Sequence, residues 1–149
     1  MIKIRRIFIA FILCFLMGGS GYADGIEIKL TVSGKLLLGI AYRHQIDPNT
    51  AIRLGSYMGV AGAPVGFQLG LVQDLMPTKE WTPTFGIGVD AIIFKKNNSF
   101  SKRIYPSAVC GLSYCPGKNT RHSGELWLGW LEKSLQPIGM NYLHLTKLF

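Results

Sequence analysis

The chain has 149 residues, which suggests one domain, and its formal net charge is +8. Its composition is 48% hydrophobic, with a mean hydropathy of +0.26. Since no long basic run accompanies the positive excess, the charge fits contact with anionic lipid head groups, or a solvated basic surface, better than binding of nucleic acid.

Residues 1–23 have the layout of a secretory signal peptide. Lys3, Arg5 and Arg6 precede an apolar run over residues 7–17, and small residues follow up to Ala23. The run is shorter than the roughly 20 residues of a membrane-spanning helix, although an uncleaved N-terminal anchor is the alternative. Cleavage would leave a β-barrel domain over 24–149. After the three basic residues of the signal are removed from the 16, this domain has 13 Lys and Arg against 8 Asp and Glu.

The mature part shows a repeated period of two and no sustained period of 3.6 residues, which predicts strands. Gly, Pro, Asn or Ser bound each segment. In chain order, the predicted strands cover residues 26–32, 35–44, 51–60, 64–73, 83–94, 105–114, 124–133 and 140–149. Long connections are expected at 95–104 (KKNNSFSKRI) and 134–139 (SLQPIG).

The two faces of these segments differ. One face is aliphatic almost without interruption, whereas glycine is the commonest residue of the other. The glycines of that face are Gly39, Gly55, Gly59, Gly66, Gly70, Gly86, Gly88, Gly111 and Gly129. Glycine weakens a strand, and a solvated face would be rich in Lys, Glu, Thr and Ser instead. The abundance of glycine on this face fits the narrow interior of a small closed barrel.

This pattern predicts an all-β fold, an eight-stranded antiparallel up-and-down transmembrane β-barrel whose aliphatic face contacts lipid. In lipid, only a closed barrel leaves no unpaired sheet edge. Outward aromatic residues near segment ends, such as Tyr42, Tyr114 and Trp130, fit the interfacial girdles of such barrels.

The signal peptide, the eight alternating segments and the terminal Phe149 together resemble the small eight-stranded β-barrels of bacterial outer membranes. The resemblance covers the whole mature chain and names no subfamily. It implies location in the outer membrane, contact with outer-membrane lipids and lipopolysaccharide, and folding by the barrel-assembly machinery. In that class an aromatic end on an alternating last strand is the assembly signal. Leu143, Leu145 and Phe149 match it on the face expected to be outward, and Lys147 is a departure.

Loop lengths depart from this class. With the C-terminus on the periplasmic side, the short connections at 33–34 and 61–63 would be external. The longer connections at 45–50, 74–82 and 115–123 would be periplasmic. Either the segment at 26–32 is misassigned, or the barrel is low on its outer side.

Charged residues of the glycine-rich face are expected inside the barrel, where buried charges must be paired. They are Glu27, Lys29, Arg43, Arg53, Asp90 and Glu125. Three acids and three bases balance, and they would fill a lumen only wide enough for its own side chains. The predicted function is therefore a structural or envelope-anchoring role, with a plugged polar lumen and no catalysis.

Two other functions are alternatives. The strand at 83–94 faintly resembles a glycine-rich strand of the lipid A deacylases, which are also eight-stranded barrels and use His-x-Ser on a lipid-facing strand with an acidic partner. No His-x-Ser is present, and the nearest form, His144-x-Thr146, lies on a face expected to be inward. The catalytic candidates of such an enzyme would be His144, Glu125 and Ser123, with His144 meeting Glu125 in the lumen. A soluble periplasmic barrel binding a small apolar ligand would instead turn its aliphatic face inward.

The motifs imply no cofactor and no metal. No phosphate-binding loop, HExxH or GxSxG occurs. Cys110 and Cys115 lack the CxxC or Cys/His partners of a zinc site, and their even number in an exported chain permits one disulfide.

Overall fold

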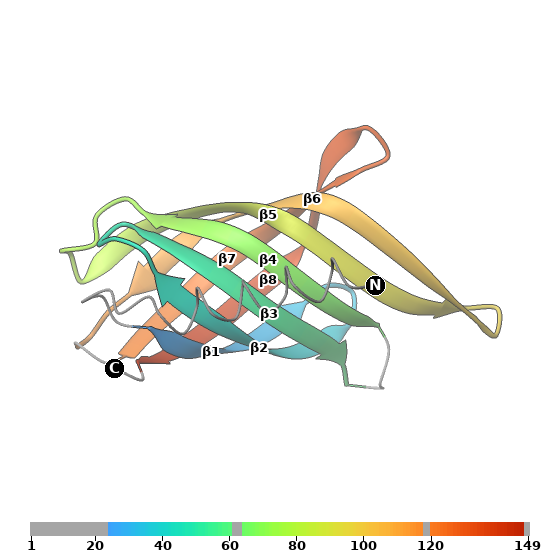
Figure 1. Cartoon of the computed structure of the whole chain (residues 1–149), viewed down its shortest axis with the longest axis horizontal. Coiled ribbons are helices and arrows are strands. Elements are labelled where there is room, and N and C mark those ends of the chain that lie inside the picture. The colour runs from blue at the N-terminus through green and yellow to red at the C-terminus, as the bar shows by residue number, and fades with distance from the viewer. Residues whose placement is uncertain (1–23, 61–63, 118–119, 148–149) are drawn as a thin grey trace, which may run out of the picture.

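The computed structural model describes residues 24–60, 64–117 and 120–147, and of Lys147 it describes the backbone alone. The predicted signal peptide and Phe149 lie outside these ranges. Eight antiparallel strands close into a barrel in chain order (Figure 1). They are β1 (Gly25–Val32), β2 (Leu36–Gln45), β3 (Thr50–Gly59), β4 (Val65–Asp74), β5 (Trp81–Lys96), β6 (Ser99–Tyr114), β7 (Thr120–Leu131) and β8 (Ser134–Lys147). The predicted fold class is confirmed. The described ranges hold no helix with the length and apolarity needed to span a membrane.

The first strand is correctly assigned, because β1 pairs along its whole length with both β2 and β8. The connections after β1, β3, β5 and β7 lie at one end of the barrel, called the hairpin end. The other connections lie at the end where β1 begins and β8 finishes, called the terminal end (Figure 1). This pairing of β1 excludes misassignment of the first strand, which was one of the two explanations for the unusual loop lengths.

Two predicted long connections are wrong, because their residues belong to strands. Only Asn97 and Asn98 join β5 to β6, and only Glu132 and Lys133 join β7 to β8. All four residues have positive φ, between 49° and 83°. Two-residue turns of this kind follow the right-handed twist of a hairpin, so the strands continue up to the turn. Both hairpins project from the hairpin end in Figure 1.

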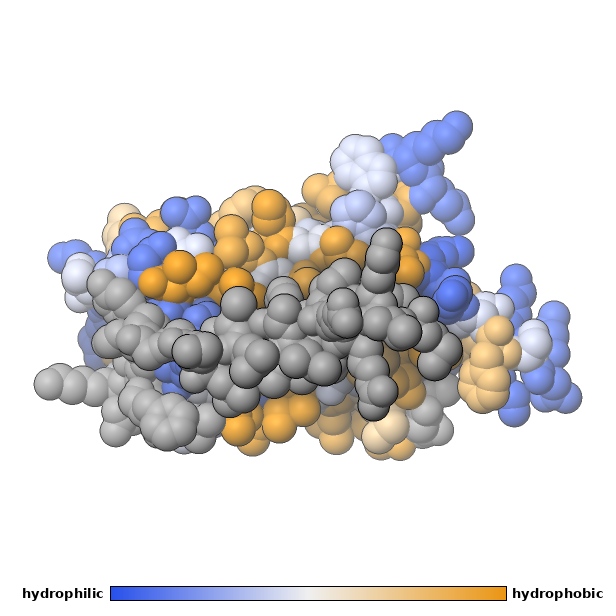
Figure 2. Space-filling model, in the orientation of Figure 1, coloured by the Kyte–Doolittle hydropathy of each residue, from blue (hydrophilic) through white to orange (hydrophobic). Residues whose placement is uncertain are grey.

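On the first seven strands the side chains alternate as predicted. The outer side chain of Ile28 is 61% exposed, whereas its neighbour Lys29 is 3% exposed. On the face shown in Figure 2, hydrophobic residues gather around the middle of the barrel and hydrophilic ones at its two ends. A soluble barrel with the aliphatic face inward is therefore excluded as a description of this structure.

The last strand departs from the prediction. Leu143 and Leu145 are 1% and 4% exposed and face the lumen, whereas Tyr142 is 48% exposed. Leu143 pairs with Lys29 of β1 and Ser123 of β7, both of which point inward. Directly paired residues share a face of the sheet. The predicted outward placement of Leu143 and Leu145 is wrong, because register with the neighbouring strands, and not apolarity, sets their direction.

A bulge shapes the start of β8. Trp127 pairs with Gly139 and Leu128 with Pro137, so Ile138 is an extra residue without a partner. Proline lacks the N–H that a regular ladder needs, and a bulge is one of the places where a sheet accepts it. Ile138 consequently packs against the apolar cluster at the hairpin end of the lumen.

Glycines of adjacent strands pair on the inner face, where Gly88 of β5 lies opposite Gly70 of β4. A Cβ on Gly88 would lie 2.4 Å from the carbonyl oxygen of Leu69 and 2.8 Å from Cα of Gly70. Both contacts are with backbone atoms, so a larger residue would have to push β4 and β5 apart. The glycine-rich inner face is thus a consequence of how little room the closed barrel leaves.

Candidate functional site

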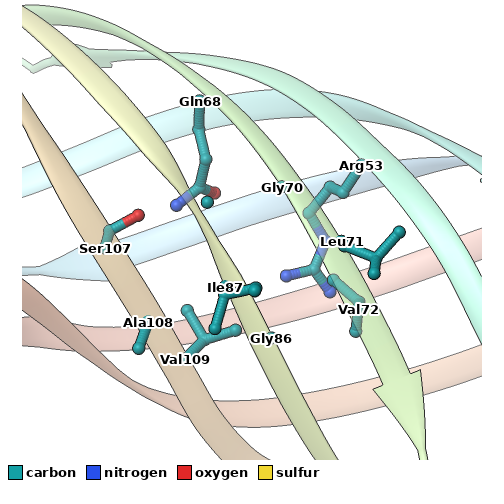
Figure 3. A pocket seen from close by; sticks show the side chains of 11 residues that line it. Arg53, Gln68, Gly70, Leu71, Val72, Gly86, Ile87, Ser107, Ala108 and Val109 are labelled. Atoms are coloured by element: carbon teal, nitrogen blue, oxygen red, sulfur yellow. The ribbon is translucent and has the colours of Figure 1, made fainter.

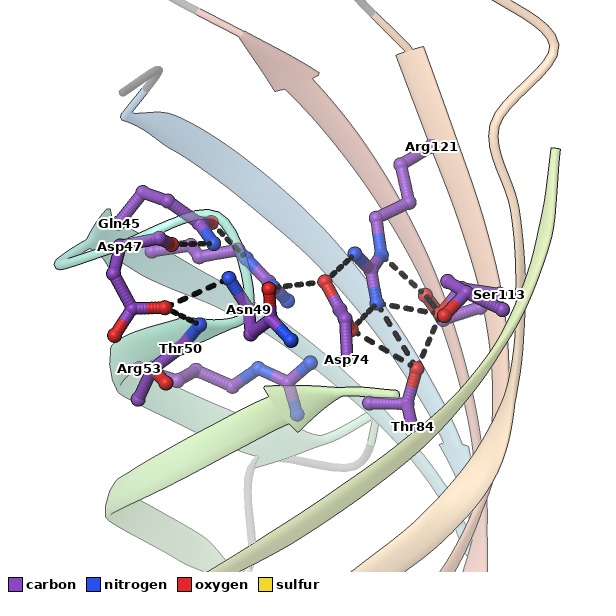
Figure 4. A network of polar contacts seen from close by, with 12 residues as sticks. Gln45, Asp47, Asn49, Thr50, Arg53, Asp74, Thr84, Ser113 and Arg121 are labelled. Carbon is purple, nitrogen blue, oxygen red and sulfur yellow. Dashed lines mark hydrogen bonds and ion pairs between the residues drawn. The ribbon is translucent and has the colours of Figure 1, made fainter. Parts of the chain in front are cut away.

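The lumen contains three polar layers, and the layer nearest the terminal end is built around Asp74 (Figure 4). Arg121 donates to both carboxylate oxygens of Asp74, at 2.5 and 2.6 Å, and Arg43 donates to one of them at 2.9 Å. Arg121 also reaches the hydroxyls of Thr84 and Ser113, at 3.0 and 2.6 Å. One carboxylate therefore orients two guanidinium groups and compensates the charge of one of them.

Arg53 occupies the middle layer between two carboxylates. It makes a bidentate pair with Glu125, at 2.9 and 2.8 Å, and its Nε lies 2.6 Å from Oε2 of Glu27. Arg43 stands 3.6 Å from the other oxygen of Glu27 and links this layer to the first. Bidentate arginine–carboxylate pairs combine strength with a defined geometry. Arg53 carries one positive charge against the two negative charges of Glu27 and Glu125, and Arg43 supplies the second cation from the neighbouring layer.

Lys29 lies in the third layer, next to aromatic rings. Its Nζ donates to Gln68 at 3.0 Å, and Gln68 in turn donates to Asp90 at 3.3 Å. The ammonium also stands 5.0 and 5.3 Å from the ring centres of Trp127 and Tyr57. Such cation–π contacts stabilise a desolvated ammonium. Lys29 therefore reaches Asp90 through the Gln68 amide.

An apolar cluster closes the lumen toward the hairpin end. Its buried members are Leu37, Tyr57, Tyr105, Val109 and Trp127. The rings of Tyr57 and Trp127 meet edge to face at 5.4 Å. Beside Arg53 and Gln68, against β4, β5 and β6, lies a cavity of about 10 Å³ (Figure 3). That volume corresponds to roughly one water molecule, so this cavity is too small for an organic ligand.

The six residues predicted for the lumen all lie there, and the structure adds Asp74 and Arg121. With this pair the lumen holds four acids and four bases. Sequence reasoning missed both because it ended the fourth strand at residue 73 and began the seventh at residue 124. Both residues would have been found if the alternation of inward and outward side chains had been followed beyond residue 73 and back before residue 124.

The catalytic candidates do not come together. Glu125 and Ser123 are buried in the lumen, but His144 pairs with His122 and Ile28 on the outer face. The predicted inward placement of His144 is therefore wrong, and so is its meeting with Glu125. The Ser123 hydroxyl is engaged by Ser113, at 2.8 Å.

A second polar cluster holds the residue before β1. Asp24 accepts hydrogen bonds from the Tyr42 hydroxyl at 2.6 Å and the Gln45 amide at 3.1 Å, and lies 3.0 Å from Nδ1 of His44. Burial alone would raise the pKa of Asp24, but the bonds from Tyr42, His44 and Gln45 hold this pKa below its usual value. The cluster fastens the start of the barrel to β2.

The part of the chain that the structure describes contains no group of three or more His, Cys, Asp and Glu side chains able to hold a metal. Cys110 and Cys115 are free thiols. Cys110 is exposed on β6 between its pairing partners Phe85 and Leu126, and Cys115 follows that strand at the terminal end.

Comparison with solved structures identifies the class of fold. The N-terminal barrel domain of OprF from Pseudomonas aeruginosa matches with a TM-score of 0.66 and 16% identity, over 83% of this chain and 96% of that one. The outer-membrane protein Ail of Yersinia pestis matches with a TM-score of 0.56 and 12% identity, over 85% and 99%. A de novo designed transmembrane β-barrel gives 0.56 and 15% identity, over 83% and 95%.

These likenesses show the fold, that of the eight-stranded transmembrane β-barrels. No protein-family model matches the chain, and no curated protein matches it significantly. Because a designed barrel with no natural history shares the architecture, the fold does not define a function. Function has to be argued from the side chains of this chain.

Breaking the middle layer tests its energetic role. Replacing Arg53 with Met leaves Glu27 and Glu125 buried without their cation, so we expect the free energy of unfolding to fall by about 3–5 kcal/mol. Urea unfolding of the barrel refolded in detergent measures the loss. The double variant Arg53→Met and Glu125→Gln should recover part of it, because one base and one acid are removed together and Glu27 keeps Arg43 at 3.6 Å. A single variant as stable as the wild type would contradict the proposed dependence.

Proposed function

We propose that the mature chain is an integral protein of the bacterial outer membrane with a structural or envelope-anchoring role and no open channel. One observation carries the proposal: an apolar outer band encloses a lumen in which four acids and four bases compensate one another. An apolar exterior suits lipid, and a lumen filled by paired side chains leaves no aqueous path.

The distribution of charge supports one orientation. The hairpin end holds six bases, Lys35, Lys95, Lys96, Lys102, Arg103 and Lys133, against the single acid Glu132. At the terminal end, the described residues outside the lumen include two bases, Lys79 and Lys147, against three acids, Asp24, Asp47 and Glu80. Among the described residues outside the lumen, the positive excess therefore lies at the hairpin end. We infer that this end faces outward, where the phosphates of lipopolysaccharide lie.

Lys95 and Lys102 are suited to such contacts. Both are exposed, and they pair across the hairpin with Phe100 and Ile93, which are also exposed. A cation next to an apolar side chain can meet a phosphate and the adjoining acyl chain together. Lipopolysaccharide is thus the partner that this end fits.

Folding through the barrel-assembly machinery is part of the same proposal. It rests on the alternation of the last strand, β8; Phe149 lies outside the described residues. Leu143 and Leu145 face the lumen once the barrel has closed, so they would be available to a receptor only before β8 pairs with β1.

No observation favours the lipid A deacylase alternative. His144 Nε2 lies 3.5 Å from the Thr146 hydroxyl, but its Nδ1 faces Nδ1 of His122 in place of a carboxylate. His144 also lies near the terminal end, which in the proposed orientation is remote from the outer leaflet that contains lipid A.

Arginine scanning tests the apolar band. Leu69 and Val89 pair on the outer face near the middle of the barrel. We expect Leu69→Arg to reduce the free energy of unfolding in lipid vesicles by about 2–4 kcal/mol, the cost at the bilayer midplane. The control Phe100→Arg, on a side chain 77% exposed beyond the band, should cost at most about 1 kcal/mol. Equal costs at the two positions would contradict the proposed membrane placement.

Cysteine accessibility tests location and orientation. A large maleimide that cannot cross the outer membrane should leave the wild-type protein unmodified in intact cells. It should reach Cys115 after the outer membrane is permeabilised, whereas Cys110 in a Cys115→Ser variant should stay protected by lipid.

Lys96→Cys, in a background of Cys110→Ser and Cys115→Ser, should be modified in intact cells. Modification of Cys115 together with protection of Lys96→Cys in intact cells would reverse the orientation, and recovery of the protein in the soluble fraction would refute the location.

A further inference from the structure

Four rings form a row on the outer face near the terminal end. Trp81 pairs directly with Tyr114, Tyr114 with His122, and His122 with His144. Trp81 and Tyr114 stack with ring centres 4.6 Å apart. Aromatic rows of this kind mark the boundary between the apolar band of a barrel and water. His122 and His144 therefore lie where dissolved ions can reach them.

Three polar atoms converge within this row. Nδ1 of His122 lies 3.3 Å from Nδ1 of His144 and 2.7 Å from the hydroxyl of Tyr142. The two imidazole rings have their centres 4.7 Å apart. The hydrogen-bonded register of β7 and β8 sets these positions, so the cluster is preorganised on two strands and does not depend on a loop.

The separation of the two nitrogens suits chelation. Zinc–imidazole bonds are about 2.0–2.1 Å long, so two nitrogens 3.3 Å apart subtend an angle of about 107° at a shared ion, close to tetrahedral. Imidazole nitrogen is a preferred donor for Zn²⁺, Ni²⁺ and Cu²⁺, whereas Mg²⁺ and Ca²⁺ require oxygen ligands.

We propose that His122 and His144 bind a divalent transition-metal ion through their Nδ1 atoms, with the Tyr142 hydroxyl and water in the remaining positions. No third His, Cys, Asp or Glu of the described ranges joins them, so the ion is held reversibly and in exchange with its surroundings. The bound ion clips β7 to β8, the strand that closes the barrel against β1, and so stabilises the closed form by mass action. The metal-binding geometry does not depend on the proposed function; only the position of the site at a membrane boundary rests on it.

Titration of the refolded, metal-free full barrel in detergent with Zn²⁺ tests the proposal by calorimetry and thermal unfolding. We expect one equivalent to bind with a rise in the unfolding temperature, and no response to Mg²⁺. Partners that only support a metal ligand change affinity about 10–100-fold, so His122→Asn and His144→Asn should each weaken binding at least about tenfold. The matched control is His44→Asn, which removes the remaining histidine of the chain and should leave Zn²⁺ binding unchanged.

Circular dichroism establishes that each variant is folded before titration, so a loss of binding cannot be attributed to unfolding. Three results would overturn the site: no Zn²⁺ binding by the wild-type barrel, unchanged binding after both substitutions, or binding that disappears only in His44→Asn. Each is compatible with an outer-membrane barrel, so failure of the metal site would be distinguishable from failure of the proposed function.

Discussion

The Arg53 guanidinium, held between Glu27 and Glu125, is the interaction on which the rest of the structure depends. Its bonds to the two carboxylates, at 2.6 to 2.9 Å, join β3 to β1 and β7 across the lumen. Three charges in so small a space are stable only in a closed barrel that excludes water and brings all of them together. The glycines of the inner face provide the necessary room, and the apolar residues are consequently directed outward.

The same constraint divides the charge of the molecule. Because the buried charges of the lumen balance, the positive excess of the described residues lies outside it, at the hairpin end. The barrel thus combines a sealed interior, an apolar band and one basic end. These three properties support the proposed placement of the basic end at an outer leaflet rich in phosphate.

Much of the fold could be predicted because alternation with period two is a local property of the chain. Ile28, Leu69 and Val89 identify the lipid face, and the charged residues between such positions identify the lumen. Strand ends were harder to predict. Glu132 and Lys133 are not typical turn residues, and the twist of the hairpin that they connect requires their positive φ. The Asp74–Arg121 pair was missed because each residue lies near the end of a strand that extends beyond its predicted limit.

The direction of β8 could not be read from its own composition. Leu143 and Leu145 have the apolarity of lipid-facing residues, yet pairing with β1 and β7 turns them inward and places Tyr142 and His144 outside. The register of β8 depends on its pairing with both neighbouring strands, so it cannot be predicted from the sequence of β8 alone. The facing histidines were invisible to sequence reasoning for the same reason, because 22 residues separate them along the chain.

The central claim is that paired side chains close the lumen, and single-channel recording in a planar bilayer tests it most directly. The purified wild-type barrel, inserted at a concentration that gives many copies per membrane, should produce no stable conductance steps. Reproducible, long-lived open steps from the wild-type protein would contradict the account, because a lumen filled by the Asp74, Arg53 and Lys29 layers leaves no continuous aqueous path.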